Sequence, residues 1–407
     1  LNMTDSSFIA SRPGLEQALE AVLVPPSGSE QPQLPNNLPN KGIGEEATLE
    51  ILAPIVIGGA RHLGAPGAFA HMDPPTPWIS WATTFWNASL NQNLLHPDLS
   101  PVAKDIERRV IDWLSPFYGM DGGHMTPGST VSNLTALWAA RDLNGIKIVV
   151  ASDASHLSIA KATHLLGLEY LSVATDTSGR LDDTKLPTDL SNAALVLTAG
   201  TTNAGAIDNL QLAERASWTH VDAAWSGPLR LSQKHASKLE GIDKADSISI
   251  SAHKLFFQPK EAGMIFFRAT EKAHSAVSFG GDYLSVPNVG VLGSHGAIAV
   301  PLLATLMSWG QSGLAERIDR AMVLAETLWS KLDTHPKVEL FGPQSSGVIL
   351  WRPHNQSGLG SIIERLPIGS TSITSVDGKQ WLRNVAANPC ADIDELWPKI
   401  ERALKKY

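Results

Sequence analysis

One stretch limits the possible folds of this chain more than any other, Ser247-Ile-Ser-Ile-Ser-Ala-His-Lys254-Leu-Phe-Phe, followed after a short gap by Gly263-Met-Ile-Phe-Phe-Arg268. Ile248 and Ile250 alternate with serines, which is the period of a strand with one buried face. That strand leads Lys254 into a turn between two apolar runs. A charged ammonium is costly to bury unless it is paired or neutralised. The sequence therefore predicts an unusual lysine at a strand end.

A neutral lysine amine is a nucleophile toward an aldehyde, and pyridoxal 5′-phosphate (PLP) is the aldehyde most often held this way. Most lysines are solvated surface groups, so Lys254 alone identifies nothing. A PLP site also needs an acid for the pyridine nitrogen and a loop that binds the phosphate. Both can be sought in the rest of the sequence.

The candidate acid is Asp222, in the segment Thr219-His-Val-Asp222-Ala-Ala-Trp225. The segment resembles a strand that ends in a carboxylate and is followed by small residues. An ionised aspartate keeps a pyridine nitrogen protonated, and a protonated ring withdraws electrons from the substrate Cα. Ala223 and Ala224 are small enough to let a flat ring lie close.

The candidate phosphate-binding loop is Thr126-Pro-Gly-Ser-Thr130, which leads into an Ala- and Leu-rich helix over residues 131–141. The start of a helix offers free backbone N–H groups and the positive end of the dipole to an anion. Alone, the same pattern describes an ordinary capped helix. The loop gains meaning because it precedes Asp222 and Lys254 in the chain.

Two further strand ends carry polar residues. His156 follows the strand-like Lys147-Ile-Val-Val150, and Thr202 lies in a glycine-containing turn after the buried run of residues 194–198. A lone histidine at a strand end is often only structural. Ligand sites of α/β sheets, however, gather at the carboxyl ends of strands. The alternation of strands and connections from residue 147 to 267 predicts a mostly parallel sheet covered by helices.

Taken together, these segments resemble the group II pyridoxal-dependent amino-acid decarboxylases, which have the aspartate aminotransferase fold (fold type I). The resemblance rests on the ordered set Pro-Gly-Ser-Thr, Ser-His-Leu-Ser, Gly-Thr-Thr, His-Val-Asp-Ala-Ala-Trp and Ser-Ala-His-Lys. It implies an α/β large domain with a mostly parallel seven-stranded sheet covered by helices, and a smaller C-terminal α+β domain. We expect an N-terminal arm and helical segment over residues 1–90, the large PLP-binding domain over 91–310 and the small domain over 311–407.

The resemblance also implies roles for individual residues. Lys254 would form a Schiff base with the cofactor, Asp222 would pair with the pyridine nitrogen, and His156 and Ala224 would lie on opposite ring faces. The softer assignments to the neighbourhood of the phosphate and the cofactor are Ser129, Thr130, Ser251, His253 and Thr202.

Two loops are candidates for contacts with the substrate. The proline-rich segment His71-Met-Asp-Pro-Pro-Thr-Pro-Trp78 matches a family loop at the substrate mouth, which makes His71 and Trp78 candidate side-chain readers. The second loop covers residues 278–288, and by the resemblance its Tyr283 matches a loop tyrosine that would protonate the substrate carbon of the quinonoid intermediate. The alternative is a simple packing tyrosine.

The resemblance implies decarboxylation of an L-amino acid to an amine and CO2. A transaminase would use a small-domain arginine to hold the α-carboxylate in the ring plane, and Arg352 and Arg383 are available for that purpose. The alternatives are a related PLP enzyme (an aminotransferase, a C–C or C–S lyase, or an aldehyde-forming oxidative deaminase) and a PLP-binding protein without catalysis. The substrate is not identified by the sequence.

Composition bounds the partners and the location. The chain has 407 residues, a formal net charge of −8 and no evident basic stripe, so we expect no nucleic-acid partner. We expect no signal peptide in residues 1–45, no membrane span and no metal site. The single cysteine, Cys390, agrees with a reducing compartment, for which we expect the cytoplasm. The resemblance implies a homodimer with shared active sites, onto whose second subunit the proline-rich arm 25–39 would pack.

Helical spacing predicts helices near residues 15–24, 45–58, 100–114 and 301–318. The third has Ser100 followed by Pro101, which indicates a serine cap with proline at the first helical position.

Overall fold

The computed structural model describes residues 8–28, 34–355 and 358–405. The chain divides into two compact units, Leu1–His62 and Leu63–Tyr407. The first unit contains helices α1 (Arg12–Leu23) and α2 (Glu45–Val56), as the helical spacing predicted. The Ser11 hydroxyl caps α1 by accepting a hydrogen bond from the Gly14 N–H. Residues 29–33 of the predicted proline-rich arm lie outside the described residues.

The second unit is built on a seven-stranded sheet with the order β1-β7-β6-β5-β4-β2-β3. Only β7 runs opposite to the other strands, because β1 and β6 both pair with it antiparallel while the remaining pairs are parallel. The prediction of a mostly parallel sheet is therefore confirmed. Its strands are β1 (Gly122–Thr126), β2 (Ile148–Ser152), β3 (Glu169–Val173), β4 (Ala193–Thr198), β5 (Trp218–Asp222), β6 (Ser247–Ser251) and β7 (Gly263–Phe267).

Apolar clusters cover both faces of this sheet. On one face, helix α5 packs across β5, β6 and β7, and contacts α6 and α7. The opposite face packs into the larger cluster that includes Ile248 and Ile250. Strand β6 is consequently buried at every position, so the prediction of a single buried face was wrong. The helices are α3 (Trp78–Leu90), α4 (Ala103–Leu114), α5 (Ser129–Asn144), α6 (Leu157–Leu165) and α7 (Thr270–Ala276).

The start of α4 also differs from the prediction. The helix begins after Val102, without a side-chain cap. The Ser100 hydroxyl instead donates to the carbonyl oxygens of Asn93 and His96, and so it stabilises the preceding turn.

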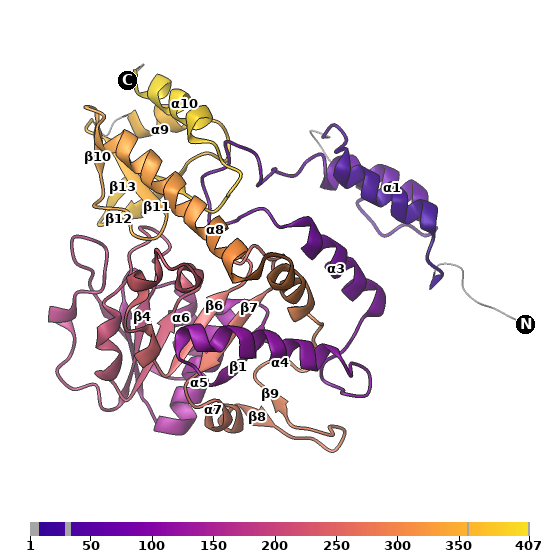
Figure 1. Ribbon diagram of the computed structural model, residues 1–407, viewed down its shortest axis with the longest axis horizontal. Coiled ribbons are helices and arrows are strands. Elements are labelled where there is room, and N and C mark those ends of the chain that lie inside the picture. The colour runs from indigo at the N-terminus through magenta and orange to yellow at the C-terminus, as the bar shows by residue number, and fades with distance from the viewer. Residues whose placement is uncertain (1–7, 29–33, 356–357, 406–407) are drawn as a thin grey trace, which may run out of the picture. The chain divides into compact units, whose positions relative to one another are not determined.

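A smaller α+β portion follows helix α8 (Ala299–Asp333), which is interrupted by a non-helical residue, Gly310, with φ 62°. Four antiparallel strands form the second sheet in the order β10-β11-β13-β12, and α8 packs on it and also on α3 and α4 (Figure 1). This arrangement confirms the predicted fold class. The domain limits at residues 90 and 310 stay predictions. The elements are β10 (Val338–Leu340), β11 (Val348–Pro353), α9 (Leu359–Ile363), β12 (Ser372–Val376), β13 (Lys379–Val385) and α10 (Ile393–Lys405).

Short elements complete the second unit. Strands β8 (Ser278–Phe279) and β9 (Asn288–Val289) form a small antiparallel pair. The 3₁₀ helices are η2 (Ser115–Tyr118), η3 (Asp183–Lys185), η4 (Leu210–Glu214), η5 (Gly227–Leu231), η6 (Ala236–Leu239) and η7 (Ile242–Lys244). In the described part of the chain, no helix has the length and apolar character needed to cross a membrane.

Candidate active site

A cavity of about 270 Å³ lies at the carboxyl ends of β4, β5 and β6, beside the first turn of α5. The fold thus joins segments that are far apart in sequence, because the parallel strands end at one edge of the sheet. Every residue predicted to hold or neighbour the cofactor lines this cavity: Ser129, Thr130, His156, Thr202, Asp222, Ala224, Ser251, His253 and Lys254.

Lys254 follows the end of β6 in a tight turn. Its backbone N–H donates to the Ser251 carbonyl at 3.2 Å, and the Phe257 N–H donates back to the Lys254 carbonyl at 2.8 Å. Phe257 has φ 59°, an uncommon conformation for a residue with a side chain. Burial lowers the pKa of the Lys254 amine, and the Asp222 carboxylate opposes that shift. The turn therefore favours the neutral amine that a nucleophile requires.

Asp222 ends β5 and is buried. Its Oδ2 accepts a hydrogen bond from Asn133 Nδ2 at 3.0 Å. Its Oδ1 accepts from the Ala224 N–H at 3.1 Å and from the Ser249 hydroxyl at 3.4 Å. Donors that converge on a carboxylate stabilise its ionised form. This geometry fits an acid that pairs with a protonated ring nitrogen.

His156 is the N-cap residue of α6. Its Nδ1 lies 3.2 Å from the Ser158 N–H nitrogen, which donates to it, and 2.8 Å from the Ser158 Oγ. Burial lowers the pKa of the imidazole, while Asp222 opposes the shift. The ring is therefore held in place by its own helix start and favours the neutral form.

The start of α5 provides the donor set that a phosphate needs. The N-cap residue Gly128 has φ 134°, and no side chain caps the first turn. A Cβ on Gly263 would lie 2.7 Å from the Gly128 Cα, so the loop approaches β7 too closely for a larger residue. The Ser129 and Ser251 hydroxyls lie 2.8 Å apart and join α5 to the end of β6.

His253 adds an unused polar atom beside this loop. Its Nδ1 is buried and makes no hydrogen bond within the described residues, and burial lowers the pKa of the ring to about 4. The free backbone donors, the hydroxyls and this imidazole fit an anionic phosphate group. Asp222 and Lys254, which line the same cavity, fit the ring nitrogen and the aldehyde group of a pyridine aldehyde.

The three predicted substrate and proton-transfer residues do not line the cavity. Tyr283 lies between β8 and β9 with 74% of its surface exposed, and Trp78 at the start of α3 is 70% exposed. His71 is exposed too. Their predicted roles stay predictions.

The charged neighbours of the site include a pair that sequence reasoning missed. Asp73, two residues after His71, forms an ion pair with Lys260, six residues after Lys254. The Asp73 charge acts on the pKa of both Lys254 and His253. A proline-rich loop gives no signal of which carboxylate it presents, so only the folded chain identifies Asp73.

The two small-domain arginines have different surroundings. Arg352 makes two contacts of 2.7 Å with the Glu339 carboxylate and stacks on the Trp381 ring, so its guanidinium is already engaged. Arg383 donates to the carbonyl oxygens of Thr202 and Ala70 at 3.0 and 3.1 Å. Burial lowers the pKa of Arg383 to about 10. Of the two, Arg383 is the one joined to the active-site turn.

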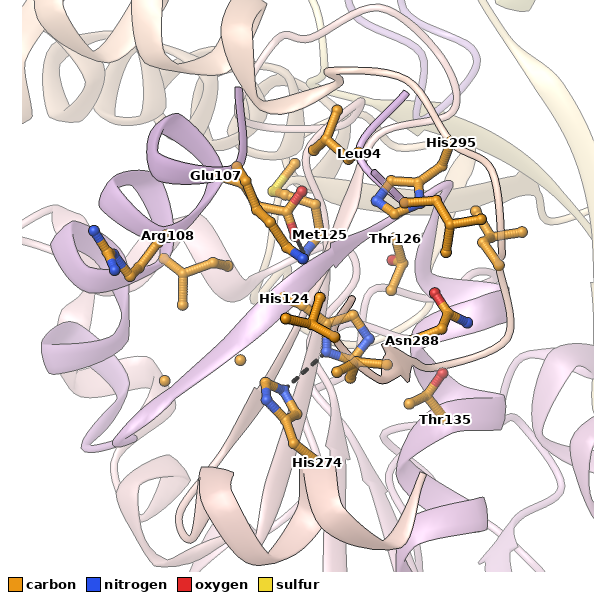
Figure 2. Close-up of a pocket in the computed structure, with 18 of the residues that line it drawn as sticks. Leu94, Glu107, Arg108, His124, Met125, Thr126, Thr135, His274, Asn288 and His295 are labelled. Carbon is orange, nitrogen blue, oxygen red and sulfur yellow. Dashed lines mark hydrogen bonds between the residues drawn. The ribbon is translucent and has the colours of Figure 1, made fainter. Parts of the chain in front are cut away.

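A second cavity, of about 600 Å³, is larger but does not include Lys254. Figure 2 shows its lining, in which His124 on β1 is hydrogen-bonded to His274 on α7 at 3.1 Å. Glu107 of α4 accepts a hydrogen bond from the Met125 N–H at 3.0 Å. We place the chemistry in the smaller cavity, because there the Lys254 amine, whose pKa burial lowers, lines the same space as the buried Asp222 carboxylate and the start of α5. Within the described residues, no group of three or more His, Cys, Asp or Glu side chains could hold a metal ion.

Comparison with protein families gives a match over residues 26–352 to the family described as the pyridoxal-dependent decarboxylase conserved domain. Among curated proteins, L-2,4-diaminobutyrate decarboxylase of Rhizobium meliloti (strain 1021) is 31% identical over 351 residues, covering 77% of this chain and 70% of that protein. Aromatic-L-amino-acid decarboxylase of Bacillus atrophaeus is 26% identical over 355 residues, covering 79% and 74%.

Solved structures show the same fold. The glutamate decarboxylase domain of a diaminobutyrate-pyruvate transaminase and L-2,4-diaminobutyrate decarboxylase from Vibrio parahaemolyticus superposes with a TM-score of 0.83 at 24% identity, covering 100% of this chain and 97% of that chain. A structure of Oryza sativa TDC with PLP and tryptamine has a TM-score of 0.86 at 20% identity, covering 100% and 99%.

Proposed function

This chain belongs to the pyridoxal-dependent decarboxylase family and is a PLP-dependent amino-acid decarboxylase, and we propose that Lys254, Asp222 and His156 are its central active-site residues. The observation that carries this assignment is that all three residues line one cavity together with Ser129 and Thr130 at the start of α5, where a phosphate would bind. PLP, when bound, supplies an electron-poor ring that accepts the electron pair left at Cα when CO2 departs.

Lys254 would bind the aldehyde group and later displace the product amine. Its amine favours the neutral form because burial lowers its pKa, and a neutral nitrogen has the lone pair that attacks a carbonyl carbon. The turn after β6 holds Lys254 at the cavity that Asp222 also lines, and the Asp222 charge acts on the pKa of the amine.

Asp222 would hold a proton on the pyridine nitrogen through its ionised carboxylate. The donors from Asn133, Ala224 and Ser249 keep that carboxylate in place. The ring nitrogen then stays positively charged, which is the condition for electron withdrawal from Cα.

His156 would stack on one face of the ring, and Ala224 would lie against the other. Decarboxylation requires the bond from Cα to the carboxylate to stand perpendicular to the ring, in a pocket with little water. The flat, neutral His156 imidazole, held by Ser158, is suited to stacking on the cofactor ring and so to fixing the plane to which that bond must stand perpendicular. Ser129, Thr130, Ser251 and His253 would bind or neighbour the phosphate, and Thr202 would lie near the cofactor.

Family membership favours decarboxylation over the aminotransferase, lyase, deaminase and non-catalytic alternatives. Arg383 remains the arginine that an aminotransferase could use, but its Nε and Nη1 donate to the backbone carbonyl oxygens of Thr202 and Ala70. Its position is consistent with support of the turn that carries Thr202.

We also propose a homodimer in the cytoplasm, with each Tyr283 serving the active site of the second subunit. An exposed tyrosine outside its own pocket is consistent with that role. Helix α3 supports the dimer because it exposes several large apolar side chains, and such patches mark interaction surfaces. They are Trp78, Trp81, Phe85, Trp86 and Leu90. His71 and Trp78 remain proposed substrate readers, and the division at residues 90 and 310 remains a proposal.

Release of amine and CO2 from a panel of L-amino acids tests the proposal. The panel should contain cationic, acidic and aromatic side chains, and the PLP-loaded protein should be compared with Lys254→Ala and with Lys161→Ala, whose lysine is exposed on α6. We expect equimolar amine and CO2 from wild type and Lys161→Ala, and no multiple turnover by Lys254→Ala. Formation of a keto acid or an aldehyde in place of the amine would reject decarboxylation.

A further inference from the structure

Behind the cavity, a chain of buried polar side chains runs from β5 and β6 into α5. Trp218 Nε1 donates to the Ser247 Oγ at 3.0 Å, and that Oγ lies 2.9 Å from His220 Nδ1. His220 Nε2 lies 2.9 Å from Asn133 Oδ1. All four side chains are buried. None of these four side chains lines the cavity. The hydrogen-bond network nevertheless continues from Asn133 to Asp222 and, through Ser158, to His156, which both line it.

Asn133 is the branch point of this network. Its Nδ2 donates to Asp222 Oδ2 at 3.0 Å and to the Ser158 Oγ at 2.9 Å. Ser158 in turn lies 2.8 Å from His156 Nδ1. One amide therefore connects the acid at the end of β5 with the histidine at the start of α6.

The direction of each hydrogen bond follows from donor and acceptor chemistry. Asp222 presents carboxylate oxygens that accept, so Asn133 faces it with its NH2 group and faces His220 Nε2 with its Oδ1. His220 Nδ1 is then an acceptor, and the Ser247 hydroxyl donates to it while accepting from the Trp218 indole N–H. The neutral imidazole then carries its hydrogen on Nε2 and donates to Asn133 Oδ1. Burial lowers the pKa of His220 to about 4, which agrees with a neutral ring.

The same reasoning continues beyond Asn133. Because its Oδ1 is the acceptor, the two hydrogens of its NH2 group go to Asp222 and Ser158, and a flipped amide would place Oδ1 against an Asp222 carboxylate oxygen. The Ser158 hydroxyl, having accepted from Asn133, donates to His156 Nδ1. The Ser158 N–H donates to the same nitrogen. In neutral His156 the hydrogen must then lie on Nε2, which has no partner within the described residues.

We propose that Asn133 is a positioning residue for two active-site groups, because it orients the Asp222 carboxylate and directs the Ser158 hydroxyl hydrogen onto His156 Nδ1, which adds to the Ser158 N–H in favour of the Nε2–H tautomer. The inference rests on the proposed roles of Asp222 and His156. His220, Ser247 and Trp218 act through Asn133, since they fix which end of its amide faces the active site. The network gives His156 a hydrogen-bond donor directed by the fold rather than by solvent.

Two variants separate the branches. Ser158→Ala removes only the hydroxyl between Asn133 and His156, whereas Asn133→Ala removes the donors to both branches. Thr135→Val is the matched control, because Thr135 is buried on the same helix and, within the described part of the chain, its hydroxyl bonds only to the Val131 carbonyl. Each protein should be studied as the PLP-loaded full chain.

The first readout is the tautomer of His156, measured by NMR on histidine-labelled protein with His156→Gln as the assignment reference. We expect the Nε2–H form in wild type and Thr135→Val. We expect a larger fraction of the Nδ1–H tautomer in Asn133→Ala and Ser158→Ala, because the Ser158 hydroxyl is then no longer oriented or is absent and only the Ser158 N–H favours the Nε2–H form. The second readout is the pH at which the absorbance of the bound cofactor titrates. It should shift in Asn133→Ala, where Asp222 loses a donor, and stay near the wild-type value in Ser158→Ala.

The third readout is turnover. Loss of an outer residue that orients an active-site group commonly lowers activity about 10-fold to 100-fold, and we expect a loss of that size in kcat for Asn133→Ala. An unchanged His156 tautomer in both variants, or a kcat no lower than that of Thr135→Val, would overturn the proposal. If Asn133→Ala does not fold, Ser158→Ala alone decides the His156 branch. Failure of the proposed function gives a different result. The wild-type protein would then release no amine from any amino acid, while the tautomer of His156 could still be measured in wild type and in the variants.

Discussion

Arg383 donates its Nε–H to the Thr202 carbonyl oxygen at 3.0 Å, which joins strand β13 of the small sheet to a turn of the active site. A second bond, from Nη1 to the Ala70 carbonyl, joins the same guanidinium to the segment before the proline-rich loop. One small-domain side chain thus connects two segments that surround the lysine site. Its first role in this fold is structural.

Arg383→Met should therefore destabilise the protein. The substitution keeps much of the side-chain volume but removes the donors to both carbonyl groups. Hydrogen bonds from charged groups contribute about 1.5–3 kcal/mol each, and we expect the free energy of unfolding to fall by about 2 kcal/mol or more. Urea denaturation measures this change. Arg109→Met, at an exposed position of α4, is the control, and an equal loss in both variants would contradict the assignment.

Asp222→Asn should lower turnover more strongly than it lowers stability. The amide retains the shape of the carboxylate but supplies no negative charge to a ring nitrogen. Removing one electrostatic partner of the reacting group costs on the order of 100-fold or more in kcat. Steady-state kinetics and the thermal midpoint should be measured together. Full activity in Asp222→Asn would remove Asp222 from the proposed chemistry.

Stability should fall as the solution is acidified, in part because of His220. Burial lowers its pKa to about 4, whereas an unfolded histidine titrates near 6.5. As the pH falls below about 6.5, the unfolded chain binds a proton that the folded chain does not, so the free energy of unfolding decreases until about pH 4. The His220 contribution is about 1 kcal/mol per pH unit.

His220→Gln should flatten this part of the stability curve. Urea unfolding at about pH 7 and about pH 5 compares the variant with wild type and with His164→Gln, whose histidine is exposed on α6. The wild type and the control should lose more stability on acidification than His220→Gln. Parallel slopes for all three proteins would contradict a neutral buried His220.

The exposed face of α3 offers a test of the dimer. Trp86 is 56% exposed there, and a glutamate in its place would put a charge into the proposed contact. We expect Trp86→Glu to shift the protein from dimer toward monomer in sedimentation experiments. Ile373→Glu, on the small sheet, should leave the mass unchanged. A monomeric wild type, or a dimeric Trp86→Glu with wild-type affinity, would argue against this surface.

Strands β2, β4, β5, β6 and β7 could be predicted because their apolar runs are local and each run ends near a polar turn, whereas the order of the strands in the sheet depends on tertiary pairing. Strand β6 shows the limit of that reasoning. Its serines suggested a solvated face, but Ser247 and Ser251 are buried because each hydroxyl has a buried partner, His220 and Ser129 respectively. Alternation in a sequence reports polarity, and only tertiary packing decides whether a polar side chain is covered.

The active site likewise contains residues that the sequence predicted and residues that only the folded structure identifies. The ordered motifs placed Lys254, Asp222 and His156 in one cavity, since parallel strands bring their carboxyl ends together. Asn133 gave no signal of its own, because a polar residue inside an Ala- and Leu-rich helix resembles any surface position. Tyr283 illustrates the converse, since the loop pattern suggested a catalytic residue but not where the loop would lie.

The central claim is that Lys254 is the lysine that holds the cofactor. Borohydride reduction of the PLP-loaded protein fixes the cofactor to that lysine, and peptide mapping then locates it. We predict a single modified peptide containing Lys254, its loss in Lys254→Ala, and its retention in Lys260→Ala, the lysine paired with Asp73. Modification of a different lysine, or full labelling of Lys254→Ala, would contradict the account.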